Sequence, residues 1–283
     1  MKHRLDQLMQ QRGLVISRSQ AESWIRLGKV FVDGQQVTKP GTFVREDANV
    51  ELRTTEQYVS RAGLKLASVA QTLHLDFRDK VLLDVGSSTG GFTDYALQHG
   101  ARKVIAVEVG TNQLHPSLQG DPRIELYEQT DIRNVQLASD EGWQLLGRHP
   151  PRTERSEYGE GAKGLTGPPL QGAAKLRTNK RVSEAPDLVV LDVSFISLRD
   201  ILPHVATLCN PQTDIIAMVK PQFEAAASNL KHKGVIKNDR LRRDILKDFE
   251  TWARPYFVIV DKADSDIAGS KGNLERFYKM RRV

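Results

Sequence analysis

From residue 60 onward the sequence alternates between short apolar runs and longer segments with helical periodicity. Runs such as Val81-Leu82-Leu83 and Leu188-Val189-Val190-Leu191 are apolar at every position, which is typical of strands buried on both faces of a parallel sheet. Strands are predicted in VLLDVG, RKVIAVEV, RIELYE, DLVVLDV, DIIAMVK, FVIVDK and LERFYKM. Helices after Ser60, from Leu198 to Leu208 and after the capping Asn238 complete a doubly wound, Rossmann-like α/β pattern.

The first part of the chain has a different pattern. Two helical segments, the second expected to end at Gly28, precede KVFVDGQQV, in which Asp33-Gly34 is a strong hairpin signal. A further strand is expected from Ala48 to Leu52. We therefore predict a small α+β domain over residues 1–59 and the α/β domain over residues 60–283.

One segment fits neither domain. Gly147 to Ala185 is rich in glycine and proline and has almost no apolar periodicity. A connection of this length without its own structure is uncommon in a compact domain, so we predict a flexible insertion over residues 147–185.

Cysteine content and hydropathy constrain the compartment. The single cysteine, Cys209, excludes an internal disulfide framework and favours a reducing environment. No apolar run approaches the roughly 20 residues that span a bilayer, and the first residues lack the apolar core of a signal peptide. A cytoplasmic protein is expected. The scattered histidines show no ligand spacing, so no metal site is predicted.

A glycine-rich loop, DVGSSTGGFTD, follows the first strand of the α/β domain, where such folds bind ligands. It lacks the Gly-Lys-Ser/Thr of a P-loop and has no G-x-G-x-x-G, which disfavours a dinucleotide. Glu108 lies 22 residues after Gly86, where a carboxylate can accept both hydroxyls of a ribose, and Asp131 could meet an adenine amino group. Together these features favour S-adenosylmethionine as the cofactor. The candidate cofactor residues are Asp84, Gly86, Ser87, Ser88, Thr89, Gly90, Gly91, Phe92, Glu108, Asp131 and Asp192.

Two resemblances go further. RLDQLMQQRGLVISRSQAESWIRLGKVFVDGQQVTKPG resembles the S4 RNA-binding domain over most of residues 2–53. Behind it, SRAGLKL, DVGSSTGGFTD, VEVGTNQL, DLVVLDVSFISL, VKPQFE, GVIKND and GNLERF resemble, in this order, the TlyA (hemolysin-A-like) family of FtsJ-type methyltransferases. The family implies 2′-O-ribose methylation of ribosomal RNA by S-adenosylmethionine. Glu108 stands where the family commonly shows Asp, and TNQL lacks the Gly that often precedes the Gln.

The S4 resemblance implies RNA binding by the basic residues of the first domain and of the chain that follows it. The net charge of +6 and the pI of about 9.4 are compatible with a polyanionic partner, and equally with a solvated basic surface. The candidate RNA contacts are Arg4, Arg12, Arg18, Arg26, Lys29 and Arg61. Ribosomal RNA or a ribosomal subunit is the expected partner, and both a monomer and a weak dimer are compatible with the sequence.

The same family resemblance implies a Lys-Asp-Lys-Glu tetrad at Lys65, Asp192, Lys220 and Glu275. A ribose hydroxyl is a poor nucleophile, so its proton must be removed and its developing negative charge stabilised. Lys220 is expected at the target hydroxyl, held by Asp192 and Glu275, with Lys65 placing the ribose or its phosphate.

Phe195 and the Phe223 of VKPQFE flank this set, either to stack on a flipped base or to pack in the core. The alternatives to an enzyme are a non-catalytic RNA-binding or ribosome-assembly protein and, less favoured, a membrane-lytic hemolysin. The intact tetrad argues against the first, and no amphipathic or spanning segment supports the second.

Overall fold

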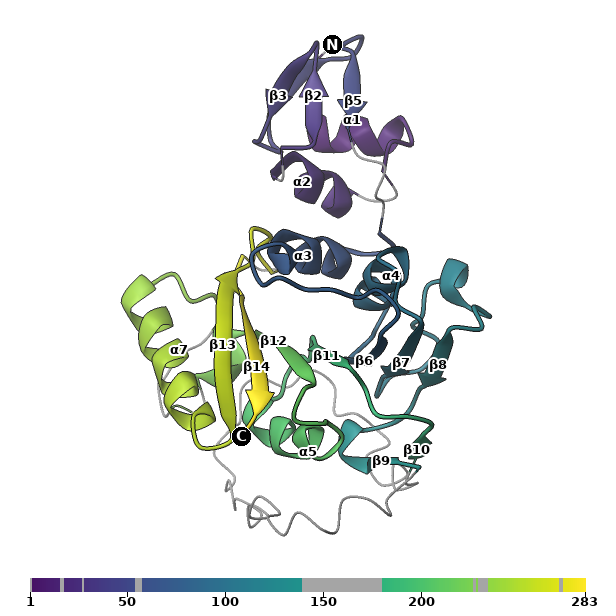
Figure 1. The fold of residues 1–283 in the computed structure, drawn as a ribbon. Coiled ribbons are helices and arrows are strands. Elements are labelled where there is room, and N and C mark those ends of the chain that lie inside the picture. Colours follow the sequence, from purple (N-terminus) through teal and green to yellow (C-terminus); the bar gives the residue numbers. More distant parts are fainter. Residues whose placement is uncertain are drawn as a thin grey trace.

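The computed structural model describes residues 2–15, 18–26, 28–53, 58–138, 180–225, 228, 234–269 and 272–283 of the chain. Within these ranges no helix is both long enough and apolar enough to cross a bilayer. The described residues form a large α/β body and a small unit that lies above α3 and α4 of that body (Figure 1).

The small unit is built from two short helices and two small sheets. Helices α1 (Leu5–Gln11) and α2 (Arg18–Arg26) bury their apolar sides against strands β2 (Val30–Val32), β3 (Gln35–Val37) and β5 (Val50–Leu52). β1 (Lys2–Arg4) pairs separately with β4 (Phe43–Arg45). The predicted hairpin is confirmed, because Asp33 and Gly34 both have positive φ between the antiparallel strands β2 and β3. Strands β1 and β4 were not predicted, because no hairpin turn joins them and Lys2–Arg4 pairs with Phe43–Arg45 from far along the chain.

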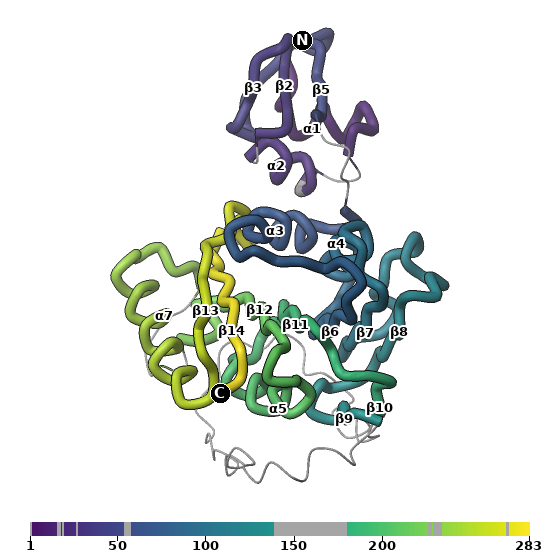
Figure 2. The backbone as a smooth tube through the Cα atoms, viewed as in Figure 1, coloured from purple at the N-terminus to yellow at the C-terminus, as the bar shows by residue number. Residues whose placement is uncertain are grey.

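The large body is organised around a seven-stranded sheet in the order β13-β14-β12-β11-β6-β7-β8. Its five parallel strands are β6 (Val81–Val85), β7 (Lys103–Val107), β8 (Ile124–Tyr127), β11 (Leu188–Leu191) and β12 (Asp214–Val219). β14 (Arg276–Arg282) lies between β12 and β13 (Phe257–Asp264) (Figure 2) and pairs antiparallel with both. All seven predicted strands are present, and the predicted fold class is confirmed.

Helices cover both faces of this sheet. On one side, α3 (Arg61–Ala70) and α4 (Gly91–Gln98) pack on the strands, and Ser60 caps α3 through its side chain as predicted. On the other side lie α5 (Leu202–Thr207) and α7 (Asp239–Ala253), and α6 (Pro221–Glu224) adjoins α7. Asn238 caps α7 by accepting hydrogen bonds from the backbone amides of Arg240 and Leu241, also as predicted.

The helix predicted from Leu198 to Leu208 is interrupted. The structure has a 3-10 turn, η5 (Leu198–Asp200), followed by α5. Pro203 occupies the first turn of α5, where its missing N–H is tolerated. An unbroken helix would need that N–H to bond to the carbonyl four residues earlier, so the chain restarts the helix at Leu202.

The predicted insertion ends earlier than expected. Residues 180–185 are ordered, and β10 (Lys180–Val182) pairs in parallel with β9 (Val135–Leu137). Val182 is buried among the apolar side chains of both strands, which explains why this end of the segment is structured. Residues 147–179 of the predicted insertion lie outside the described residues.

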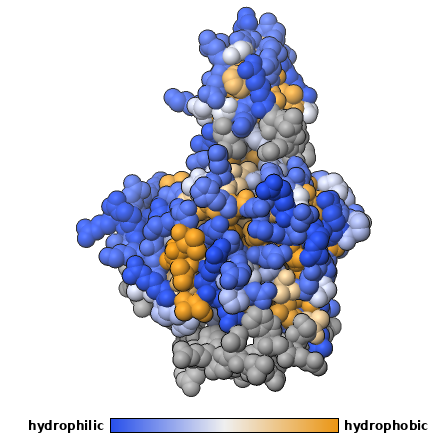
Figure 3. Space-filling model, in the orientation of Figure 1, coloured by the Kyte–Doolittle hydropathy of each residue, from blue (hydrophilic) through white to orange (hydrophobic). Residues whose placement is uncertain are grey.

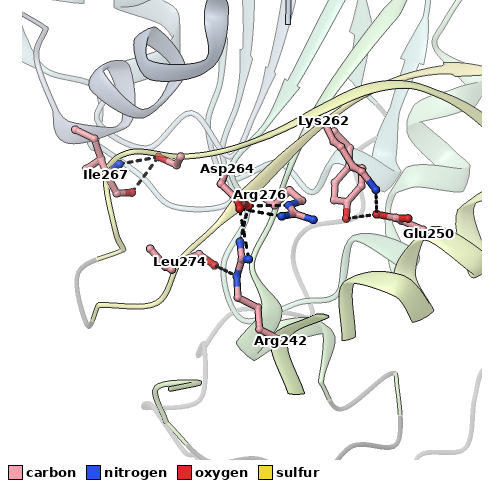
Figure 4. A network of polar contacts seen from close by, with 9 residues as sticks. Arg242, Glu250, Lys262, Asp264, Ile267, Leu274 and Arg276 are labelled. Atoms are coloured by element: carbon pink, nitrogen blue, oxygen red, sulfur yellow. Dashed lines mark hydrogen bonds and ion pairs between the residues drawn. The ribbon is translucent and has the colours of Figure 1, made fainter. Parts of the chain in front are cut away.

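A network of ion pairs joins the C-terminal strands to α7 (Figure 4). Asp264, at the end of β13, accepts hydrogen bonds from Arg276 at 2.7 and 2.8 Å and from Arg242 of α7 at 2.5 Å. Burial alone would raise the pKa of Asp264, but hydrogen bonds and charge from the two guanidinium groups outweigh it and lower that pKa to about 2. The ionised carboxylate therefore stabilises the fold above pH 4, and this contribution is lost as the pH falls toward 2.

We expect Asp264→Asn to lower the melting temperature at pH 7 by about 3–6 °C, which corresponds to roughly 1–2 kcal/mol for a partly exposed network. The difference between variant and wild type should shrink as the pH is lowered from 4 to 2. Thermal unfolding followed by circular dichroism measures both. Asp266→Asn is the control, because that exposed carboxylate makes no ion pair with another described residue. An unchanged melting temperature in Asp264→Asn at pH 7 would contradict the assigned role.

The face of the molecule shown in Figure 3 is mostly hydrophilic, with an apolar strip over β13. Val258 and Val260 of this edge strand are about half exposed. A β-bulge between Ile259 and Asp261 breaks the register there, and such irregularities protect edge strands from pairing with other chains.

Candidate active site

The pocket lies at the edge of the sheet where the parallel strands end. β6 lies between β7 and β11. From β6 the chain adds β7 and β8 on one side and then β11 and β12 on the other, so the strand order reverses at β6. A cavity of about 280 Å³ opens there. Its walls come from the start of α3, the glycine-rich loop and the ends of β11 and β12, and are formed by Ser60, Arg61, Ala62, Lys65, Asp84, Gly86, Ser87, Ser88, Thr89, Phe92, Asp192, Ser194 and Lys220.

The glycines of the loop are required mainly by the packing of the chain itself. Gly86 has a φ of +80°, and a Cβ there would lie 2.7 Å from the carbonyl oxygen of Asp192. At Gly91 a Cβ would lie 2.2 Å from Oγ of Ser60 and would separate α4 from α3. Gly90 and Gly91 are buried and do not line the cavity. The close contacts at Gly86 and Gly91 therefore hold β6 against β11 and α4 against α3 around the pocket.

Asp84, the penultimate residue of β6, is fully buried in the wall of this cavity. Thr93 donates a hydrogen bond to its Oδ2 at 2.7 Å, whereas Oδ1 has no partner among the described residues. Burial raises the pKa of Asp84 to about 7, against the effect of the Thr93 hydrogen bond and with a further contribution from the nearby Asp192 carboxylate. A buried carboxylate with an unpaired oxygen facing a cavity is suited to a cationic ligand.

Neither of the two predicted adenosine contacts lines the cavity. Glu108 follows β7, and its carboxylate accepts hydrogen bonds from the backbone amides of Ser88 at 2.9 Å and Gly110 at 2.7 Å. Asp131 caps the short turn η2 (Ile132–Asn134), and its carboxylate is paired with Arg133. Glu108 thus joins the glycine-rich loop to the end of the second strand, while Asp131 is engaged locally.

The four predicted catalytic residues converge as two ion pairs. Nζ of Lys220 lies 2.5 Å from Oδ1 of Asp192, and Nζ of Lys65 lies 2.5 Å from Oε2 of Glu275. Both lysines are at least 90% buried, so neither is an ordinary surface cation. Because β14 is antiparallel to its neighbours, Glu275 at its beginning reaches the edge where the parallel strands end.

One expected contact within the tetrad is wrong. Glu275 was expected to hold Lys220 together with Asp192, but its ion pair is with Lys65. β14 places Arg276 opposite Val219, so Glu275 starts beside the end of β12. Its carboxylate nevertheless pairs with Lys65 of α3, while Lys220 pairs with Asp192, which directly follows the neighbouring strand β11.

Ser194 was not predicted and completes the environment of Lys220. Its Oγ accepts a hydrogen bond from Nζ of Lys220 at 2.9 Å and lines the cavity. The sequence signal was its place two residues after Asp192, directly after a buried strand.

The two phenylalanines differ in their exposure. Phe195 is 91% exposed, has a φ of +67° and contacts Phe223, with ring centroids 5.3 Å apart. Core packing, the alternative considered for Phe195, is excluded by this exposure. A bulky residue held in the left-handed region is strained, and such strain persists where the surrounding structure enforces it.

The predicted RNA contacts fall into three groups. Arg4 and Arg18 both pair with the buried carboxylate of Asp6 in the small unit, and Arg12 donates to backbone carbonyls of the turn after β4. Arg26 and Lys29, at the end of α2 and just beyond it, are exposed and make no ion pair within the described ranges. Arg61 lies away from both and lines the cavity.

The chain matches the S4 domain over residues 3–50 and the FtsJ-like methyltransferase over residues 58–282. Hemolysin A of Brachyspira hyodysenteriae is 32% identical over 275 residues, covering 96% of this chain and 97% of that protein. The 16S/23S rRNA (cytidine-2′-O)-methyltransferase TlyA of Mycobacterium tuberculosis is 32% identical over 281 residues, or 98% of this chain and 89% of that protein. A solved structure, named as a candidate hemolysin from Streptococcus thermophilus, has a TM-score of 0.60 at 31% identity and covers 100% of this chain and 89% of its own.

Proposed function

Since this chain belongs to the FtsJ-like methyltransferase family and carries an S4 domain, we propose that it methylates a ribose 2′-hydroxyl of ribosomal RNA with S-adenosylmethionine. The observation that carries the proposal is the pair of buried lysine–carboxylate contacts at the edge of the sheet, beside the glycine-rich loop. In this proposal residues 1–59 bind RNA and residues 60–283 carry out the transfer, in the cytoplasm where ribosomal RNA is found.

The residues of the pocket fit the cofactor. Asp84 has an unpaired buried oxygen, and Ser87 has a buried hydroxyl without a partner among the described residues, so both can bind the ammonium and carboxylate of a methionine tail. Glu108 keeps acceptor capacity for ribose hydroxyls, because each of its oxygens receives one hydrogen bond. When bound, S-adenosylmethionine supplies an electrophilic methyl group on a positively charged sulfur.

The protein residues then handle the ribose oxygen. The ammonium of Lys220 has three N–H donors, of which Asp192 and Ser194 occupy two. The third can donate to the ribose oxygen and stabilise the negative charge that develops there, while the hydroxyl proton passes to the carboxylate of Asp192, which lines the same cavity. Lys65, held by Glu275, places the ribose or its phosphate on the other side of the pocket.

The proposal is tested by incubating the purified protein with methyl-labelled S-adenosylmethionine and each ribosomal subunit, then mapping 2′-O-methyl groups by resistance to alkaline cleavage. We expect labelling of a discrete ribose. The M. tuberculosis relative is named for cytidines of both 16S and 23S rRNA, so both subunits must be tested. Binding of RNA and of cofactor without transfer to any ribosomal substrate would favour the non-catalytic alternative.

Arg26 and Lys29 are proposed to contact RNA phosphates. We expect the double variant Arg26→Gln/Lys29→Gln to bind the subunit more weakly and to reduce the slope of log affinity against log salt by about 1–2. Filter binding at several salt concentrations measures both. The control, Arg78→Gln/Arg102→Gln, removes the same charge from exposed residues beyond the opposite edge of the sheet. Equal slopes in the two double variants would remove Arg26 and Lys29 from the RNA interface.

A further inference from the structure

A single buried carboxylate joins the two loops that carry Asp192 and Lys220. Glu224, at the end of α6, is 1% exposed. Its Oε2 accepts a hydrogen bond from the hydroxyl of Ser197 at 2.6 Å, and its Oε1 accepts one from the backbone amide of Leu198 at 2.7 Å. Nε of Arg199 lies 3.4 Å from Oε2. The loop after β11 is therefore tied to α6, which follows β12 directly.

These contacts are difficult to replace. Burial raises the pKa of Glu224, while the hydrogen bonds from Ser197 and Leu198 and the charge of Arg199 act in the opposite direction. Hydrogen bonds to a buried charged acceptor are stronger than those between neutral groups, and loss of such an acceptor leaves its donors unsatisfied. Ser197 also caps η5 by accepting from the amide of Arg199, so its hydroxyl is already oriented.

The segment held in this way is the one that contacts Lys220. Between Asp192 and Ser197 lie Ser194, which accepts a hydrogen bond from Lys220, and the strained Phe195. One end of the segment is fixed by the β6–β11 pairing, in which the amide of Asp192 donates to Val85. The other end is fixed by Glu224. Release of that end would let the positive φ of Phe195 relax and would move the Ser194 hydroxyl.

We propose that Glu224 is a positioning residue for methyl transfer: it fixes the 194–197 segment and thereby the direction in which Lys220 points its remaining N–H. Glu224 does not line the cavity and acts only through Ser194 and Lys220. This inference rests on the proposed function, because its readout is the rate of methyl transfer.

The test is the variant Glu224→Gln, whose amide group replaces an acceptor with a donor facing Ser197 and Arg199. We expect kcat to fall by about 10- to 100-fold, since small misplacements of a catalytic group have effects of this size. The dissociation constant for S-adenosylmethionine, measured by calorimetry, should change less than about threefold, because no cofactor contact is altered. The matched control is Glu250→Gln, which removes a carboxylate that accepts from Lys262 and Tyr278 away from the pocket and should leave kcat unchanged.

Coupling to Ser194 separates positioning from a merely structural role. Ser194→Ala alone should lower kcat. Adding Ser194→Ala to Glu224→Gln should cause little further loss, because both substitutions disturb the orientation of the same N–H of Lys220. If Glu224→Gln does not fold, Ser197→Ala serves in its place, since it keeps the carboxylate and removes one donor.

The outcomes are distinguishable. Failure of the wild-type protein to methylate any ribosomal substrate, with cofactor bound, would overturn the proposed function itself. An active wild type, with kcat in a folded Glu224→Gln or Ser197→Ala variant within twofold of it, would overturn the positioning role alone. Losses that multiply in the double variant with Ser194→Ala would overturn it as well.

Discussion

Replacing Lys220 with alanine should reduce the rate of methyl transfer by at least about 1000-fold, the combined size expected for loss of charge stabilisation and of proton handling. Lys220 is nine-tenths buried, and Asp192 and Ser194 direct its ammonium group toward the cavity. Its side chain is not expected to contribute strongly to cofactor affinity, so calorimetric binding of S-adenosylmethionine should stay within a few-fold of wild type. Single-turnover transfer to the ribosomal subunit is the direct measurement of the rate.

Lys279→Ala is the matched control for Lys220→Ala. Lys279 is buried to the same extent on β14, and its Nζ lies 3.3 Å from Asp214 and donates to the carbonyls of Leu73 and His74. Its loss should lower the melting temperature without a comparable effect on single-turnover transfer. If Lys220→Ala kept more than a tenth of the wild-type rate, the hydroxyl would have to be handled by another residue, and Lys65 would be the next to test.

The second large effect is expected at Asp84. Asp84→Asn should weaken binding of S-adenosylmethionine by at least about 30-fold, because removing one partner of a buried charged contact costs roughly 2 kcal/mol or more. Its pKa of about 7 makes the wild-type affinity depend on pH, since a protonated carboxyl must ionise before it can bind a cation. Affinity should therefore decrease as the pH falls below 7 in the wild type, and this dependence should be lost in the variant.

The same substitution should stabilise the protein without ligand. A carboxyl group whose pKa is raised on folding favours the folded state at low pH, and this contribution is lost as the pH rises to 7. At pH 8 the wild type carries a buried, unpaired charge that Asn lacks, so the variant should melt at a higher temperature there, with a smaller difference at pH 5.

Asp187→Asn is the control for Asp84→Asn, because Asp187 accepts from the amide of Val81 at the other end of β6 and should not affect cofactor affinity. If the Asp84→Asn variant bound S-adenosylmethionine as tightly as the wild type does, the cationic group of the cofactor would have to bind elsewhere.

The predictable parts of the fold are those marked by a clear pattern within a few consecutive residues, such as an apolar run or a helix cap. The uninterrupted apolar run Leu188-Val189-Val190-Leu191 can only be satisfied by burial on both faces, and the structure places β11 at the centre of the sheet. Asn238 before a strongly amphipathic segment marked the start of α7. Strands β9 and β10 were missed because three-residue strands are stabilised by a partner more than 40 residues away in the chain, which local patterns do not report.

At the site, the sequence predicted which residues come together but not which of them contact one another. Lys65, Asp192, Lys220 and Glu275 do meet at one edge of the sheet, but their division into two ion pairs depends on side-chain contacts that the sequence does not report. Gly86 and Gly91 are also needed where the loop meets β11 and α3, which are close contacts that the loop sequence does not reveal. The tie between Glu224 and Ser197 could not be foreseen, because a buried glutamate in a short helix looks like any other helical glutamate until its partners are placed.

The position of β14 also bears on how the enzyme matures. Every strand that flanks it precedes it in the chain, yet β14 lies between β12 and β13 and links them. Until it inserts, the sheet ends at β12, β13 has no neighbour, and Lys65 lacks its carboxylate partner. Methyl transfer would thus report that the sheet has closed, because β14 brings with it the carboxylate that pairs with Lys65.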